Sequence, residues 1–183
     1  SLAAQTDPLT GLPNRAMFEE MLQDEVHRAD RQSQRLALLF VNLDGMKAVN
    51  ESFGQAAGDM VLREIGQRLA QIGGEQLTVA RAGGDEFLLL LSGNPATHDA
   101  SQLATRVLSA FQAPCKFEGH EVSVPCSIGI AMYPEHGALS KLIAHADAAM
   151  QGAKRTGGAT YCFFEARMVS GAREQIELLH DLR

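Results

Sequence analysis

Acidic residues and glycines gather at two places in the sequence where they could bind a metal ion and a phosphate. Residues 42–47 (NLDGMK) follow a strongly apolar run, and residues 83–87 (GGDEF) separate two further apolar runs. Carboxylate oxygens are ligands that Mg2+ prefers in proteins, and glycine lets another group approach the backbone closely. A magnesium ion beside such a backbone is typical of phosphoryl-transfer sites.

The same residues also have an ordinary interpretation. Taken singly, the first cluster is a loop with solvated polar side chains, and the second is a tight turn with two exposed carboxylates. Together they favour a site, because polar residues at the end of a buried strand and at the tip of an adjacent hairpin can converge. We therefore expect the two clusters to meet, with Asp85 and Glu86 supplying the carboxylates.

Apolar runs predict the strands that carry both clusters. Leu36–Leu43 predicts a strand buried on both faces, followed by a polar, glycine-broken segment over residues 44–59. The two glycines of the second cluster predict a hairpin with strands at 77–82 and 85–91, because tight hairpin turns need positive φ at their central residues.

The rest of the chain alternates helices with strands. Helical periodicity predicts helices over residues 14–33, 60–72, 98–111 and 141–155, with Asn14 capping the first and Ser140 the last. Further strands are expected at 116–117, 120–132 and 161–164. This alternation predicts an α/β (α+β) domain with a central sheet flanked by helices, and the hairpin makes the sheet mixed.

Composition narrows the function classes. The chain has 183 residues, enough for one compact domain, and its net charge of -6 argues against nonspecific nucleic-acid binding, which requires a basic surface. No apolar run approaches the roughly 18 residues that cross a bilayer. Three scattered cysteines do not suit a disulfide framework, so we expect reduced thiols in a cytoplasmic domain.

Four motifs together carry a family resemblance. Residues 83–87, preceded by Arg81, spell the signature of GGDEF domains, and residues 7–15 (DPLTGLPNR) are similar to the D-x-L-T-G-L-x-N-R that opens them. Residues 127–131 (SIGIA) and 146–150 (ADAAM), with Lys154 just after, resemble the two later motifs. The resemblance covers about residues 6–164 in order, so the sequence is identified as a member of the GGDEF, or diguanylate cyclase, family.

Membership implies a palm-like fold related to nucleotidyl cyclases and polymerase palms. It also implies a reaction in which two GTP molecules, one on each subunit of an antiparallel homodimer, condense to cyclic di-GMP and two pyrophosphates with Mg2+ or Mn2+. Each 3'-hydroxyl attacks the α-phosphate of the other nucleotide, which requires alignment, charge neutralisation and a proton acceptor.

The resemblance also implies a role for individual residues. Asn50 and Asp59 are expected to read guanine, since a carboxylate can accept from the N1–H and the amino group, which adenine does not offer together. Asp85 is expected to bind the metal, and Glu86 to help activate the hydroxyl. The other expected contacts are Gly83 and Gly84 against the nucleotide, the Leu43 carbonyl and Asn42 in the metal shell, and Lys47 and Lys154 on the phosphates.

Several positions depart from the family pattern. Asn42 stands where the family places its first metal-binding aspartate, and an amide oxygen brings no negative charge to magnesium, so we expect metal binding or turnover to be weaker by about 10–100-fold. Gly158 stands where a phosphate-binding arginine is expected. The R-x-x-D motif of product inhibition falls on Gly74 and Leu77, which cannot form that site. The other departures are Met46 for phenylalanine, Glu51 for aspartate, Gln55 for histidine and Gln151 for tyrosine.

Two functions are compatible with the sequence. One is an enzyme that makes cyclic di-GMP, and the other is a regulatory domain that binds GTP, or only partner domains, and controls an attached phosphodiesterase. We expect residues 1–165 to form the GGDEF domain and residues 166–183 to form a helix similar to the linker that joins GGDEF to EAL domains. An ordinary C-terminal helix is the alternative for that tail.

Overall fold

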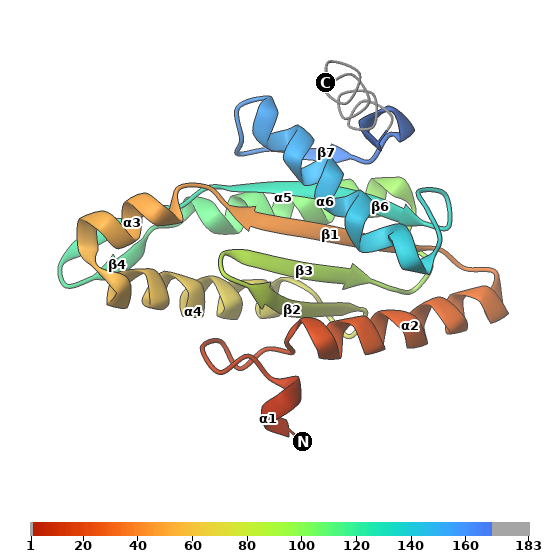
Figure 1. Ribbon diagram of the computed structural model, residues 1–183, viewed down its shortest axis with the longest axis horizontal. Coiled ribbons are helices and arrows are strands. Elements are labelled where there is room, and N and C mark those ends of the chain that lie inside the picture. The colour runs from red at the N-terminus through yellow and green to blue at the C-terminus, as the bar shows by residue number, and fades with distance from the viewer. Residues whose placement is uncertain (1, 170–183) are drawn as a thin grey trace, which may run out of the picture.

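A mixed five-stranded sheet forms the centre of the computed structural model, which describes residues 2–169 (Figure 1). The strand order is β2-β3-β1-β6-β7, in which only the β6–β7 pair is parallel. The strands are β1 (Leu36–Leu43), β2 (Leu77–Gly83), β3 (Glu86–Leu91), β6 (Cys126–Tyr133) and β7 (Tyr161–Phe163). The expected mixed sheet is therefore confirmed.

Helices cover both faces of this sheet. One face packs against α4 (Gln55–Ile72) and α5 (Thr97–Gln112), and the other packs against α2 (Arg15–Gln32) and α6 (Leu139–Arg155). Successive residues of a strand point to opposite faces, so β1 needs apolar side chains at nearly every position. The smaller elements are α1 (Leu2–Gln5), α3 (Met46–Phe53), β4 (Cys115–Phe117) and β5 (His120–Val122).

The strongest sequence signals match the observed elements. The first long helix starts after Asn14, whose Oδ1 accepts a hydrogen bond from the Met17 backbone N–H at 2.9 Å, as an N-cap should. The central strand spans Leu36–Leu43 as predicted. The hairpin turns at Gly83 and Gly84, which have φ values of 122° and 51°.

The polar, glycine-broken segment over residues 44–59 is mostly helical, although no helix was predicted there. It contains α3 and the beginning of α4, with only Gly54 separating the two helices. Gly54 has φ of 90°, which lets the chain turn sharply without ending helical structure on either side. Met46 and Val49, three residues apart, give α3 a buried face.

Two smaller predictions are wrong. Ser140 is not a cap, because α6 begins at Leu139 and its N-cap is Ala138. The single strand expected over 120–132 is divided into β5 and β6 by a segment that contains Pro125, which has no N–H to donate to a ladder.

The cysteines are free thiols, as expected: Cys115 and Cys126 are buried and Cys162 is half-buried. Within residues 2–169, none of the helices is long and apolar enough to cross a membrane. Residues 166–169 are helical, and most of the predicted C-terminal linker helix lies outside the described residues.

Candidate functional site

A row of polar side chains crosses three neighbouring strands at one end of the sheet. Asn42 on β1 pairs in register with Glu86 on β3 and with Ser127 on β6. Side chains of residues paired in register lie on the same face of a sheet. Phe40 is two residues from Asn42 on β1, and Leu88 is two residues from Glu86 on β3, so each shares a face with its neighbour. Both Phe40 and Leu88 pack in the core formed with α2 and α6. The polar row therefore lies on the face that α2 and α6 cover.

The two clusters singled out in the sequence meet at this end of the sheet. The Leu43 backbone N–H donates to the Asp85 carbonyl oxygen at 3.0 Å. The Asn42 Nδ2 donates to Asp85 Oδ1 at 3.2 Å. The expected convergence of the strand end and the hairpin tip is confirmed.

Asn42 has one buried polar atom to which no other residue in 2–169 is hydrogen-bonded. The residue is 5% exposed, and the unpaired atom is its Oδ1. Such an atom is costly unless a ligand pairs with it. Oxygen donors suit Mg2+, and the Asn42 amide oxygen, the Asp85 carboxylate and the Leu43 carbonyl are oxygen donors, so these residues fit that ion.

Within residues 2–169, no three histidine, cysteine, aspartate or glutamate side chains lie close enough together to hold a metal ion.

Arginine 81 fixes the hairpin to the start of the chain. Its guanidinium donates to the Gly84 carbonyl oxygen at 2.7 Å and to Asp7 Oδ1 at 2.9 Å. Asp7 is 8% exposed, and its other oxygen accepts from the Thr10 backbone N–H at 2.8 Å. The opening motif therefore positions the hairpin. At the hairpin turn itself, an ideal Cβ on Gly83 or on Gly84 would have no atom within 4 Å, so another molecule can approach this backbone closely.

Glu86 has the electrostatic character of a proton acceptor. Burial raises the pKa of its carboxyl, and the negative charges of Asp147 and Asp85 raise it further, while Arg15 and Lys154 act in the opposite direction. A carboxylate whose pKa is raised is a stronger base than an ordinary glutamate.

A second pair of acceptors lies on α3 and α4. Asn50 Oδ1 is buried and has no hydrogen-bond partner in the described part of the chain. It lies over Gly58, where an ideal Cβ would be only 1.9 Å away. Asp59, one residue further, is half-buried and accepts from Gln55 Nε2 at 3.1 Å. Two acceptors side by side suit a ligand with two neighbouring donors. Figure 1 shows α3 at the same end of the sheet as the β2–β3 hairpin.

The two predicted phosphate-binding lysines differ in their surroundings. Lys154, in the last turn of α6, has its Nζ 3.8 Å from Oδ1 of Asp44, the residue that follows β1. Lys47 is 89% exposed on α3, and its Nζ is 3.9 Å from Glu51 Oε1. The structure therefore brings Lys154, but not Lys47, into contact with a residue at the end of the central strand.

Comparison with known families decides the identity. Residues 4–160 match the family described as "Diguanylate cyclase, GGDEF domain". The chain belongs to the GGDEF family.

The relatives of this GGDEF domain include a bifunctional protein named for both cyclic di-GMP synthesis and hydrolysis, and a protein named for hydrolysis alone. It is 44% identical over 178 residues to the bifunctional diguanylate cyclase/cyclic di-GMP phosphodiesterase MucR of Pseudomonas aeruginosa, covering 97% of this chain and 26% of MucR. It is 35% identical over 183 residues to the cyclic di-GMP phosphodiesterase PdeR of Escherichia coli, covering 100% of this chain and 27% of PdeR. The chain thus spans about a quarter of the length of these two relatives.

A solved GGDEF domain confirms the expected fold. The structure of TpbB (YfiN) from P. aeruginosa that comprises only the GGDEF domain superposes with a TM-score of 0.88 at 38% identity. The superposition covers 92% of this chain and 99% of that one.

Three polar residues of this GGDEF site lie in clusters or motifs that the sequence singled out but were assigned no role of their own. Asp44 and Ser127 are hydrogen-bonded to each other, and Asp147 on α6 acts electrostatically on Glu86. A signal for Asp44 was available, since residues two apart on a strand share a face and Asp44 follows Asn42 by two. The partner Ser127 depends on strand register, which the local sequence does not specify.

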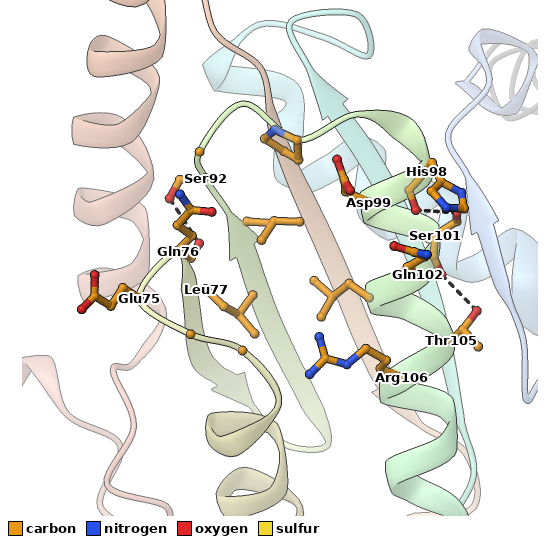
Figure 2. Close-up of a pocket in the computed structure, with 16 residues that line it drawn as sticks. Glu75, Gln76, Leu77, Ser92, His98, Asp99, Ser101, Gln102, Thr105 and Arg106 are labelled. Carbon is orange, nitrogen blue, oxygen red and sulfur yellow. Dashed lines mark hydrogen bonds between the residues drawn. The ribbon is translucent and has the colours of Figure 1, made fainter.

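A cavity of about 1040 Å³ lies at the opposite end of the β2–β3 hairpin (Figure 2). It is lined by residues of the 73–77 loop, the 91–95 loop and α5. Arg106 reaches from α5 toward the 73–77 loop and donates to the Ile72 carbonyl oxygen. Gly74 and Leu77, where the family's R-x-x-D would stand, both line this cavity and supply neither a guanidinium nor a carboxylate.

Proposed function

We propose that this GGDEF domain binds GTP with Mg2+, in the manner of the cyclases that condense two GTP molecules to cyclic di-GMP and pyrophosphate. The observation that supports this most is the pair of buried, unpaired amide oxygens, Asn42 Oδ1 and Asn50 Oδ1. The first belongs to a side chain that contacts Asp85, and the second lies over Gly58, the residue before Asp59. These are the two positions where the metal and the guanine are expected.

Each residue would have a distinct task in the proposed site. Asn50 and Asp59 would accept hydrogen bonds from guanine, and the open backbone at Gly83 and Gly84 would lie against the nucleotide. Glu86 would take the proton of the attacking 3'-hydroxyl, a task that its raised pKa favours.

Charge neutralisation completes the proposed chemistry. Asp85, Asn42 and the Leu43 carbonyl would hold Mg2+ or Mn2+, which neutralises phosphate charge when bound. Lys154 would contact the phosphates, and Lys47 would reach them only by leaving Glu51.

Turnover would require a second copy of the chain. One such domain holds one GTP, so two nucleotides can react only when two domains face each other as a homodimer. The names of MucR and PdeR include a cyclic di-GMP phosphodiesterase activity, and this chain covers about a quarter of each, which supports a fused phosphodiesterase domain. We propose that this domain is of the EAL type, that a sensory domain is also attached, and that the protein works in the cytoplasm, where GTP is available.

A regulatory role is the second candidate. Asn42 and Gly158 remove one negative and one positive charge from the proposed triphosphate site. A domain with these losses can still bind GTP and change the activity of an attached phosphodiesterase.

Nucleotide binding and turnover together test the proposal. Calorimetry with Mg2+ should give tighter binding of GTP than of ATP, because a site that hydrogen-bonds one base edge leaves buried groups unpaired with another base. Asp59→Ala should abolish that preference, whereas Asp24→Ala, on the exposed side of α2, should not. Equal affinity for the two nucleotides would refute the proposal.

A GTP turnover assay on a protein fused to a dimerising segment, with Mg2+ and with Mn2+, separates the two candidates. Cyclic di-GMP formation favours the enzyme, and GTP binding without product favours the regulatory domain.

A further inference from the structure

Asp44 connects three elements at the end of the central strand. Ser127 Oγ on β6 lies 3.0 Å from each Asp44 carboxylate oxygen. The Ala159 backbone N–H, in the loop after α6, donates to Asp44 Oδ2 at 3.3 Å. The Nζ of Lys154, in the last turn of α6, is 3.8 Å from Asp44 Oδ1.

The Ser127 side of this cluster is rigid. Ser127 is 0% exposed and pairs in register with Asn42 near the start of β6, so its hydroxyl is enclosed by the fold. Its hydroxyl donates to the Asp44 carboxylate, which is 22% exposed and faces α6 and its following loop. The carboxylate is therefore oriented by the sheet and faces the lysine side chain, which is 37% exposed.

Gly158 lets the loop lie directly on this carboxylate. Its φ is 74°, and an ideal Cβ at this position would be 3.0 Å from Asp44 Oδ2 and 3.4 Å from Ser127 Oγ. A larger residue would therefore be strained and would press on the carboxylate. The departure at position 158 and the Asp44 contact belong to one local arrangement.

We propose that Asp44 is a positioning residue that holds Lys154 in place for a nucleoside triphosphate. This proposal rests on the proposed function, in which Lys154 contacts the phosphates. A free lysine side chain must lose rotamer freedom on binding, and holding it beforehand reduces that cost. Asp44 does this through Lys154 and does not itself contact the nucleotide.

A double-mutant cycle tests the proposal, with GTP and GMP compared by calorimetry in Mg2+. Asp44→Asn keeps an acceptor for Ser127 and removes the charge that holds Lys154. It should lower GTP affinity by about threefold to tenfold and leave GMP affinity within about twofold. In a Lys154→Met background, Asp44→Asn should cause no further loss, since the two residues act as one unit. Matched controls are Asp24→Asn and Lys141→Met, which change exposed charges on α2 and α6.

Several results would overturn this role. They are an unchanged or higher GTP affinity in Asp44→Asn, equal losses for GTP and GMP, or an undiminished loss in the Lys154→Met background. If Asp44→Asn does not fold, Ser127→Ala, which removes the hydroxyl that orients the carboxylate, replaces it in the same cycle with the same expectations. Failure of the unaltered protein to bind GTP would overturn the proposed function as well, so the two failures are distinguishable.

Discussion

Asn42 places a buried amide in the candidate site, where it donates to the Asp85 carboxylate. This bond has a physical consequence for the protein without a metal ion. An aspartate at position 42 could not donate, and two carboxylates would face each other across the same 3.2 Å contact. The amide thus favours the metal-free state, and a carboxylate would favour the metal-bound state.

The substitution Asn42→Asp should therefore change stability and turnover in a metal-dependent way. Its melting temperature should be lower than that of the unaltered protein in chelator and should rise more on addition of Mg2+. Cyclic di-GMP formation by a dimerised protein should increase by about tenfold or more in Mg2+. The increase should be smaller in Mn2+, which binds nitrogen and oxygen ligands more tightly.

Asn94→Asp, at an exposed turn, is a control that adds the same charge elsewhere. If Asn42→Asp shows the same Mg2+ dependence of melting as the unaltered protein, this residue does not limit metal binding. A variant that binds GTP and still forms no product with either metal would favour the regulatory function.

Glu86 gives a second prediction, on the pH dependence of stability. Its folded-state pKa is raised by burial and by Asp147 and Asp85. The folded protein therefore holds this proton more tightly than the unfolded chain, and stability falls as pH rises from the ordinary glutamate range through the raised pKa. Glu86→Gln carries no charge, so it should be more stable than the unaltered protein at pH 7–8 and equally stable near pH 4.

The expected gain in melting temperature is small, on the order of 1–2 °C, and is measured across a pH series. Glu20→Gln, at an exposed position of α2, should show no such pH-dependent gain. A Glu86→Gln variant less stable than the unaltered protein at neutral pH would show that the carboxylate is stabilised in the fold, contrary to this argument.

At the scale of elements, the contact between α6 and β6 determines where Asp147 and Lys154 lie. An ideal Cβ on Gly129 would be 2.0 Å from the Ala146 carbonyl oxygen and 2.2 Å from the Met150 backbone nitrogen. Helix and strand backbones touch here, and neither can move aside as a flexible side chain could.

Gly129→Ala should consequently destabilise the domain by about 2–4 kcal/mol in chemical denaturation, because overpacking against backbone forces the helix away from the sheet. Gly74→Ala is the matched control, since a Cβ there meets nothing within 4 Å. The control should be neutral or slightly stabilising. Equal effects of the two substitutions would contradict the close packing of α6 on β6.

Elements with strong local signals could be predicted from the sequence, and those that depend on weak patterns or on strand register could not. The strand Leu36–Leu43 was predictable because a short, uninterrupted apolar run has few alternatives to a buried strand. The helix start at Asn14 was predictable because the side chain of this residue accepts from a backbone N–H only three residues away. The helix α3 was missed because its apolar face consists of only Met46 and Val49. The Asp44–Ser127 contact was not predictable, because the two residues lie 83 positions apart and meet only through the register of β1 and β6.

At the scale of the whole molecule, the sheet separates two regions with different chemistry. Glu86 begins β3 beside the proposed nucleotide site, and Leu91 ends it at the cavity of about 1040 Å³. The residues of β3 between them are buried, so a ligand at the cavity would act on the site through the packing around this strand. The cavity of this chain has the space for such a ligand, but Gly74 and Leu77 give it no matching charges.

Cyclic di-GMP should therefore not inhibit this protein from the cavity. In turnover assays or GTP calorimetry, micromolar cyclic di-GMP should cause no noncompetitive effect. The reason is that position 74 has no guanidinium and position 77 has no carboxylate to pair with the guanines and phosphates of cyclic di-GMP. Gly74→Arg with Leu77→Asp restores both groups on the 73–77 loop, where residue 74 faces open space. This double variant should bind cyclic di-GMP measurably, whereas Gly74→Arg alone should bind it about tenfold less tightly. Noncompetitive inhibition of the unaltered protein, or cyclic di-GMP bound between the 73–77 loop and α5 in a crystal, would show that Arg106 and its neighbours form an inhibitory site without that motif.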